Sequence, residues 1–244
     1  MRIIKVDAID STNTFVRKFY AGTSEFEPVC VTARLQLQGR GQRGAIWKSE
    51  AGKNLTFSIL YPHQKLEISR HFLLSAQVAL SILKVLKELQ VPRLSVKWPN
   101  DILSANKKIG GILIENILNS DGIVASVIGI GLNVNQVDFG EFGNAGSLCS
   151  VSGKTFDLDE LLKNLLQQIE NDLQELPKRR KAEILEDYED KMFRIDQVSV
   201  FRLFKTNKEV NGIIRGVSGE GKLQLELEDL GLLEFDLKEV QLLY

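Results

Sequence analysis

Reactive and metal-binding side chains are scarce in this sequence of 244 residues. Its two cysteines are Cys30, in an apolar run, and Cys149, in a polar connection. Neither their number nor their spacing suggests a disulfide framework or a zinc site. The two histidines, His63 and His71, are predicted to lie on the surface. The sequence therefore offers no Ser-His or Cys-His constellation for nucleophilic catalysis.

Excess charge and long apolar runs are also missing. The 31 basic and 32 acidic residues give a formal net charge of -1, so no broad field attracts nucleic acid or an acidic membrane surface. The amino-terminal stretch lacks the apolar segment of a secretion signal, and no run approaches the roughly 18 apolar residues of a membrane span. These absences predict a cytoplasmic protein that has neither DNA nor a membrane as a partner.

Hydrophobic periodicity predicts a larger mixed unit followed by a small β unit. Strands are predicted at residues 2–9, 28–37, 54–62, 93–98 and 123–134, with a hairpin over 101–116. Helical spacing is most regular over 69–89, and 156–188 is helical with a break at Pro177. Beyond Phe193 only short alternating runs remain. We predict an α+β fold in which a mixed sheet with packed helices spans 1–192 and a small β domain spans 193–244.

The glycine-rich segment QGRGQRGAIW, residues 38–47, has the G-x-G-x-x-G spacing of a dinucleotide-binding loop. Such a loop must open a helix, whereas this one leads into another strand, and no P-loop pattern accompanies it. The glycines allow close backbone approach, and Arg40 and Arg43 offer forked donors to carboxylate or phosphate oxygens. A solvated basic loop is the alternative interpretation.

Two further segments combine cations with turns or glycines. KWPND, residues 97–101, gathers a lysine, an aromatic ring, a rigid turn and two polar side chains, although a turn with Trp98 in the core would also explain it. KIGGILIE, residues 108–115, places Lys108 at a strand entrance beside two glycines, where a ligand can approach closely. A hairpin lysine in water is the alternative there.

Together, Ser11-Thr12-Asn13, GRGQRG, KWPND, KIGGILIE and GIGLNVN occur in the order and approximate spacing of biotin protein ligases. The chain resembles that family from about residue 3 to 135. The resemblance implies a class II synthetase-like, or biotin–lipoate ligase, catalytic fold followed by a small SH3-like β-barrel. Because the first family motif appears at residue 10, we expect the monofunctional type without an amino-terminal DNA-binding domain.

The resemblance implies a two-step acyl transfer. Biotin and ATP, with Mg²⁺, would give biotinyl-5′-AMP and pyrophosphate, and a lysine of a biotin carboxyl carrier domain would then take the biotin. Because that amine belongs to the carrier, the enzyme needs no nucleophile of its own. A homodimer is compatible with the family pattern.

The resemblance also assigns roles to individual residues. The catalytic residues would be Arg40, Arg43 and Lys108. Biotin would be bound by Ser11, Thr12, Asn13, Gln36, Arg40, Gly41, Gln42 and Lys108. The nucleotide would contact Arg43, Trp47, Asn100 and Asn133. Asp101 is a candidate ligand for Mg²⁺.

Gln42 departs from the family pattern, because many bacterial relatives carry GRGRRG with an arginine at this place. Glutamine keeps hydrogen-bonding capacity but removes a charge, so retention of the adenylate is in question. Two rival functions remain: a lipoate or octanoate protein ligase of the same superfamily, and a non-catalytic ligand-sensing module. KWPND and the intact GRG favour biotin.

Overall fold

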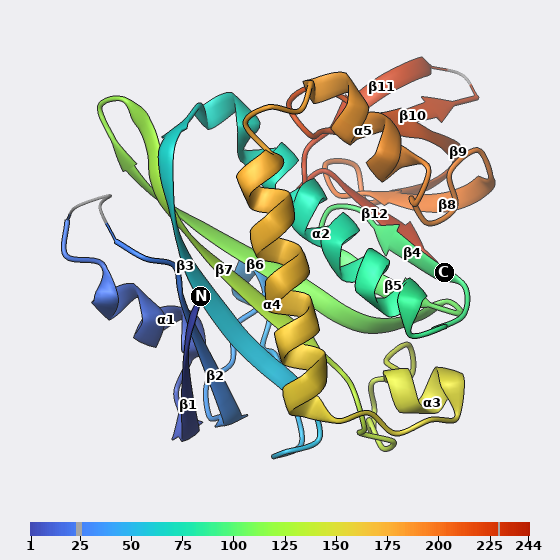
Figure 1. Ribbon diagram of the computed structural model, residues 1–244. Helices are drawn as coiled ribbons and strands as arrows, with labels where there is room; N and C mark the ends of the chain where they lie inside the picture. The colour runs from blue at the N-terminus through green and yellow to red at the C-terminus, as the bar shows by residue number, and fades with distance from the viewer. Residues whose placement is uncertain (23–25, 229) are drawn as a thin grey trace.

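The structure is a computed structural model that describes residues 1–22, 26–228 and 230–244, and of Arg43 and Lys65 it describes the backbone alone. Seven strands form one mixed sheet in the order β1-β2-β3-β7-β6-β5-β4 (Figure 1). They are β1 (Arg2–Ile9), β2 (Val29–Gln36), β3 (Leu55–Leu66), β4 (Leu94–Lys97), β5 (Asp101–Ser104), β6 (Lys107–Asn119) and β7 (Gly122–Leu132). β1 runs parallel to β2, and the other neighbouring strands are antiparallel.

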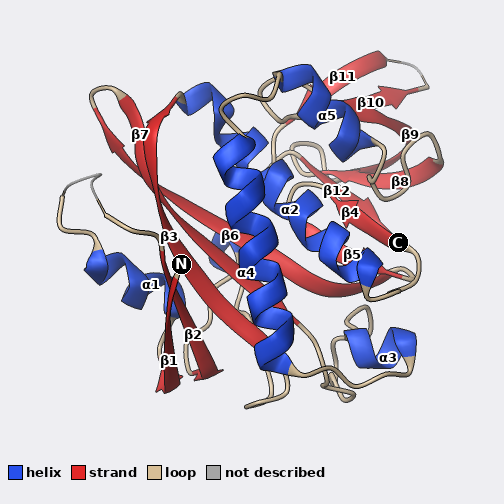
Figure 2. Ribbon diagram, in the orientation of Figure 1, coloured by secondary structure: helices blue, strands red, loops and turns tan. Residues whose placement is uncertain are grey.

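Two long helices, α2 (His71–Glu88) and α4 (Leu158–Glu175), cover one face of this sheet (Figure 2). α4 begins where the Asp157 carboxylate accepts a hydrogen bond from the Glu160 backbone N–H at 2.9 Å, which satisfies one free donor of the first turn. Its buried residues recur every three or four positions and face the core: Leu161, Leu162, Leu165, Leu166, Ile169 and Leu173. The helices and the sheet thus enclose the main hydrophobic core.

The opposite face of the sheet carries the short helix α1 (Thr12–Val16), which continues as a 3₁₀ turn over Arg17–Phe19. Val16 is fully buried there against Val31 and Val127 in a second, smaller apolar cluster. The remaining helices are α3 (Leu148–Ser152) and α5 (Lys181–Glu189).

A second sheet follows, with five antiparallel strands in the order β11-β10-β9-β8-β12. They are β8 (Val198–Leu203), β9 (Lys208–Val217), β10 (Leu223–Leu227), β11 (Gly231–Phe235) and β12 (Val240–Leu243). The α+β class and the small β unit are confirmed. In the described part of the chain β11 and β12 are the two edges, so the strands form an open sheet.

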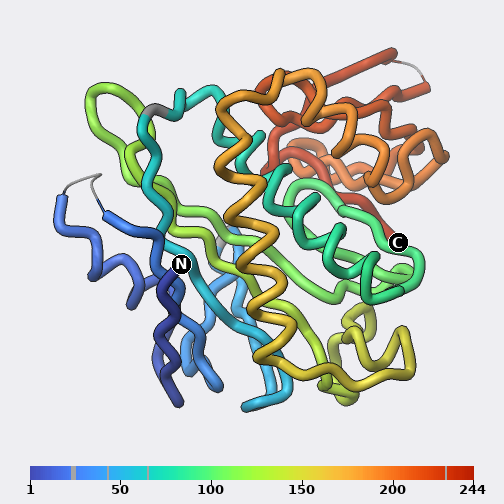
Figure 3. Tube along the Cα trace, viewed as in Figure 1, coloured from blue at the N-terminus to red at the C-terminus, as the bar shows by residue number. Residues whose placement is uncertain are grey.

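The small β unit lies against the β4–β5 edge of the large sheet, and Figure 3 shows the last strand of the chain beside that edge. Trp98 Nε1 donates a hydrogen bond to the Gly221 carbonyl at 2.9 Å. The Val217 backbone N–H donates to the Glu189 carboxylate at 2.8 Å. Trp98 of the KWPND corner is therefore bonded to the small β unit, and Glu189 of α5 makes a second link between the two units.

The predicted elements are found, with β3 continuing four residues beyond its predicted end. The hairpin turn at Ala105 and Asn106 uses positive φ angles of 51° and 66°. One residue prediction is wrong: His63 lies within β3, part-buried, with Nε2 2.9 Å from Ser126 Oγ. His71 is exposed, as predicted. In the described parts of the chain, no helix has the length and apolar character that a membrane crossing requires.

Candidate active site

A cavity of about 240 Å³ opens on the face of the sheet that carries α1. Gly129 and Gly131 of β7 form part of its wall and alternate with Ile128 and Ile130, which reach the core under α2 and α4. The glycines are required by close packing: a Cβ on Gly129 would overlap the Asn13 amide, and one on Gly131 would overlap the Trp47 indole. The cavity thus lies between the α1 corner, the sheet and the glycine-rich loop.

Buried polar groups line one end of the cavity, where α1 meets β2 and β3. The backbone N–H and the hydroxyl of Thr12 donate to Gln36 Oε1 at 2.8 and 3.1 Å. Ser58 Oγ, fully buried, lies 2.7 Å from Thr12 Oγ1 and 2.6 Å from Asn13 Oδ1. Ser11, also buried, precedes the helix as its N-cap. This end can hydrogen-bond a neutral polar group.

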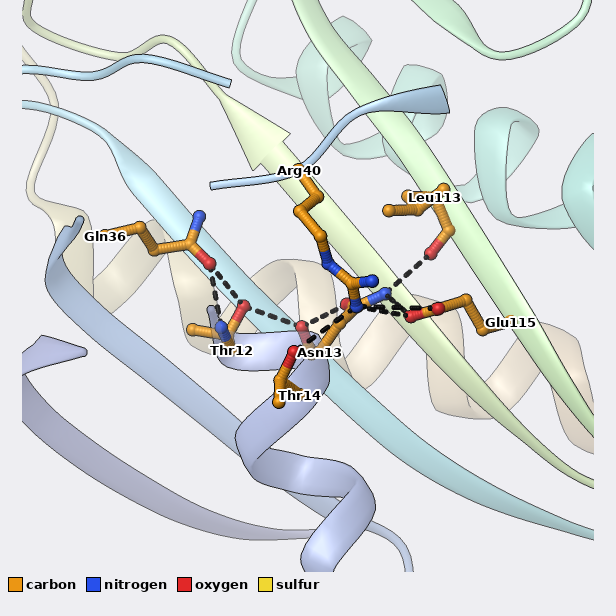
Figure 4. A network of polar contacts seen from close by, with 8 residues as sticks. Thr12, Asn13, Thr14, Gln36, Arg40, Leu113 and Glu115 are labelled. Carbon is orange, nitrogen blue, oxygen red and sulfur yellow. Dashed lines mark hydrogen bonds and ion pairs between the residues drawn. The ribbon is translucent and has the colours of Figure 1, made fainter. Parts of the chain in front are cut away.

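Arg40 reaches this network from the glycine-rich loop (Figure 4). Its Nη2 lies 3.2 Å from Glu115 Oε2 and 3.3 Å from Thr14 Oγ1. Asn13 Nδ2 donates to the same Glu115 oxygen at 2.8 Å and to the Leu113 carbonyl at 3.4 Å. Glu115 therefore joins Arg40 to the α1 corner.

The other end of the cavity is charged. Lys108 Nζ lies 2.6 Å from Asp101 Oδ1, with the two side chains 37% and 20% exposed. The same ammonium lies 6.0 Å from the centre of the Trp47 ring. Trp47 Nε1 is buried and has no hydrogen-bond partner among the groups that the structure describes. This end offers a cation, an aromatic surface and an unused donor.

The glycine-rich loop folds over the cavity as a small hairpin. The Trp47 backbone N–H donates to the Gly39 carbonyl at 2.9 Å, and the Gly41 N–H donates to the Ala45 carbonyl at 2.7 Å. At its tip the 3₁₀ turn Gln42–Gly44 ends with Gly44 at a φ of 80°, a conformation that glycine adopts without strain. The loop thereby connects two strands, as the sequence predicts.

The structure gathers most of the predicted residues on the cavity wall: Ser11, Thr12, Asn13, Gln36, Arg40, Gly41, Gln42, Trp47, Asn100, Asp101 and Lys108. Asn133 is not among the wall residues, and its Nδ2 donates to the Gly146 carbonyl at 2.9 Å. The side chain of Arg43 lies outside the described part of the chain. Nucleotide contacts by Asn133 and Arg43 stay predictions.

Three residues of this region are absent from the predicted site. Ser58 carries no motif signal, because one serine in an alternating strand is ordinary. Glu115 is the last residue of KIGGILIE and Lys97 is the first residue of KWPND, so both belong to motifs that the sequence analysis identified. Burial lowers the pKa of Lys97, the Asp101 carboxylate opposes this shift, and Lys108 adds to it. Lys97 therefore lies within electrostatic reach of the charged end of the cavity.

Known proteins resemble this chain in both sequence and structure. It is 29% identical over 222 residues to the bifunctional ligase/repressor BirA of Salmonella typhimurium, a match covering 89% of this chain and 67% of the relative. It is 35% identical over 125 residues to a biotin--[acetyl-CoA-carboxylase] ligase of Paracoccus denitrificans, covering 51% of each.

A solved biotin protein ligase from Aquifex aeolicus, in complex with biotin and ATP, superposes with a TM-score of 0.79 at 27% identity. That superposition covers 99% of this chain and 98% of the other. The model of the biotin/lipoate A/B protein ligase family matches residues 6–135, which contain all the segments that line the cavity. The chain therefore belongs to the biotin/lipoate A/B protein ligase family.

Proposed function

We propose that this protein is an ATP-dependent biotin ligase, which activates biotin as biotinyl-5′-AMP and transfers it to a lysine of a carrier domain. The observation that carries the proposal is the division of one cavity into a neutral hydrogen-bonding end and a cationic end. Biotin has the same division, with a neutral ureido ring at one end and a carboxylate at the other. Relatives and a solved neighbour named as biotin ligases support the assignment.

The ureido ring belongs at the α1 corner on this proposal. The hydroxyls of Thr12 and Ser58 and the Gln36 amide form a connected set of donors and acceptors there. A buried ureido group left unpaired would cost about 1–3 kcal/mol per lost partner, so such a set is needed to bind it. Leu113, the register partner of Gly129, and the Trp47 indole on the wall provide the apolar surface for the remainder of the molecule.

Adenylate formation requires a carboxylate to attack an anionic phosphate. A biotin oxygen forms a bond to the α-phosphorus, the bond from that phosphorus to the bridging oxygen breaks, and pyrophosphate leaves with the electron pair. Lys108 is placed to balance the charge of the reacting groups. Arg40, paired with Glu115 beside Asn13, lies at the end that takes the ureido ring. Trp47 would border the adenylate while the loop hairpin excludes water from the mixed anhydride.

Mg²⁺ fits this site as a companion of ATP. In the described residues no group of three or more metal-ligating side chains gathers, whereas Mg²⁺ at nucleotide sites usually needs one or two carboxylates besides the phosphates. Asp101, on the cavity wall beside Lys108, is the carboxylate that would hold it. When bound, the ion would reduce the negative charge of the phosphates that Lys108 and Lys97 face.

The second step uses the amine of the carrier. Its nitrogen attacks the acyl carbon of the adenylate, the carbon–oxygen bond to phosphate breaks, AMP leaves, and the amine loses a proton. Lys108 can stabilise the negative charge that develops on the departing phosphate. A biotin carboxyl carrier domain is the acceptor we expect.

The proposal predicts biotin-dependent exchange of labelled pyrophosphate into ATP, because adenylation is reversible while the adenylate remains bound and pyrophosphate dissociates and rebinds. The assay is run with biotin, lipoate and octanoate in parallel. Exchange with biotin alone supports the proposal. Exchange with lipoate or octanoate but not with biotin would identify the rival ligase, and no exchange with any acid would leave the ligand-sensing module.

Several properties stay predictions of the proposed function. We expect a cytoplasmic enzyme without a DNA partner. Sedimentation at micromolar concentration would distinguish a homodimer, which the family pattern allows, from a monomer. The division into a catalytic domain over 1–192 and a small β domain over 193–244 also stays a prediction.

A further inference from the structure

A second cavity, of about 300 Å³, lies between the two sheets. Its wall combines the KWPND corner with apolar residues of the small β unit, including Phe204, Leu223 and Val240. Gln42 and Asp101 line both this cavity and the first one. The two spaces therefore meet at the charged end of the candidate site.

Two lysines surround the carboxylate at that junction. Lys97, the last residue of β4, is the register partner of Asp101 on β5. Asp101 also pairs with Lys108 at 2.6 Å. One carboxylate between two ammonium groups leaves one positive charge uncompensated, so the junction attracts an anion. Lys97 lines the second cavity, whereas Lys108 lines the first.

An aromatic ring from the last residue of the small β unit, Tyr244, contacts Lys97. Lys97 Nζ lies 4.4 Å from the centre of the Tyr244 ring, within cation–π distance. The Tyr244 ring packs edge-on against Phe193, with the ring centres 5.1 Å apart, and the Tyr244 carbonyl accepts a hydrogen bond from Asn144 at 3.4 Å. Phe193 thus packs against the ring while Asn144 bonds the main chain of Tyr244, and the ring restricts where the flexible Lys97 side chain can place its ammonium.

In the proposed reaction, the departing phosphates of the nucleotide are the anionic partner of the Lys97 ammonium. Attacking and leaving oxygens lie roughly in line through the α-phosphorus. Biotin reaches Lys108 from the first cavity. The leaving phosphates therefore point away from biotin, toward the junction with the second cavity. Negative charge accumulates on those phosphates as the bond breaks, and Lys97 is the second cation there.

We propose that Tyr244 is a positioning residue for adenylation: its ring fixes the Lys97 ammonium where the departing phosphates of the nucleotide gather. The proposal rests on the proposed function. It explains why the KWPND corner contacts both units, because Lys97 belongs to one unit and the Tyr244 ring that contacts it belongs to the other. Tyr244 does not itself touch the reacting atoms.

Variants of the full chain at position 244 test this inference through biotin-dependent pyrophosphate exchange. Tyr244→Leu removes the ring, and we expect the KM for ATP to rise about fivefold or more, as loss of a partly buried cation–π contact predicts. Tyr244→Phe keeps the ring and should stay within about twofold of the parent, since the π face carries the interaction. The KM for biotin should not change in either variant. A KM for ATP in Tyr244→Phe as high as that of Tyr244→Leu would overturn the proposal.

Lys97→Met provides the coupling test. If Tyr244 acts through Lys97, then Tyr244→Leu has no further effect in the Lys97→Met background, whereas independent effects would multiply. Melting curves and biotin binding by calorimetry verify that each variant is folded.

Binding of inorganic pyrophosphate, measured by calorimetry, separates this inference from the proposed function because it needs no turnover. Weaker binding by Tyr244→Leu, with Tyr244→Phe unchanged, supports the role of Tyr244 even if biotin gives no exchange. Equal pyrophosphate affinity in the parent and Tyr244→Leu would overturn it, whatever the parent catalyses.

Discussion

Individual cations of the site already have carboxylate partners in this structure. Arg40 pairs with Glu115 and Lys108 with Asp101. The Arg40 side chain is 49% exposed, so water weakens its ion pair with Glu115. Replacing Glu115 by another anion therefore costs little free energy. Another anion can displace Glu115 from Arg40, and the Glu115 carboxylate keeps its hydrogen bond from Asn13. The resting pairs hold the cations in position without blocking substrate.

Gln42 is the residue at which the loop chemistry can be tested. It lines both cavities, and replacing it by arginine adds a fixed positive charge near the adenylate phosphate. We expect Gln42→Arg to slow release of biotinyl-5′-AMP by about tenfold, the factor that corresponds to one charge-assisted hydrogen bond of about 1.4 kcal/mol. Rapid mixing of the preformed complex with excess biotin measures the release rate.

Gln42→Glu is the matched control for that experiment. It has nearly the size of glutamine but the opposite charge to arginine, and it should speed release. Equal or faster release from Gln42→Arg would contradict the electrostatic account of adenylate retention.

Among the elements, β3 contributes to both faces of the sheet. Ser58 points to the candidate site, while Tyr61 and His63 lie on the other face toward α4. Burial lowers the pKa of His63 to about 4, well below its ordinary value of 6.5. The folded protein therefore holds this histidine neutral beside the Ser126 hydroxyl.

The His63 shift predicts a pH-dependent stability. Between about pH 6.5 and 4 the unfolded chain binds a proton that the folded chain does not, so the free energy of unfolding falls as the pH decreases. We expect a loss of about 1–2 kcal/mol across this window, less than the full shift implies because water reaches part of the ring. Urea unfolding at several pH values measures it.

His63→Gln lacks the titrating ring and is the control. Other acidic groups titrate in both proteins, so the contribution of His63 is the difference between the two stability profiles. Parallel profiles from pH 7 to 4 would show that His63 is not the cause.

On the scale of the whole molecule, the small β unit supports the site from outside. The Trp98 indole bridges the two units by donating to Gly221, and Tyr244 lies under Lys97. Neither contact is local in sequence. The mutual position of the two sheets therefore decides the geometry of the KWPND corner, and through it the charge at the junction of the two cavities.

Trp98→Phe tests this support. The change keeps an aromatic ring but leaves the Gly221 carbonyl without its donor, which we expect to lower the free energy of unfolding by about 1 kcal/mol. Trp47→Phe is the comparison, because Trp47 Nε1 has no partner among the described groups and its loss costs no hydrogen bond. Chemical denaturation measures the free energy of unfolding of both variants. Equal decreases in the two variants would refute a specific role for the Trp98 hydrogen bond.

The sequence by itself determined the secondary structure and the order of the motifs, because period-2 and period-3.6 patterns and turn residues are local properties. It also placed Arg40, Lys108 and Thr12 in the site through a family resemblance. Only the tertiary structure decided which side chains meet. Asn13 contacts Glu115 across 102 positions of the chain, and Lys97 contacts Tyr244 from the other unit. Such contacts depend on the strand order, in which β7 separates β3 from β6, and on how the two sheets pack. No local sequence pattern encodes the strand order or the packing of the two sheets, because both depend on which apolar faces bury one another.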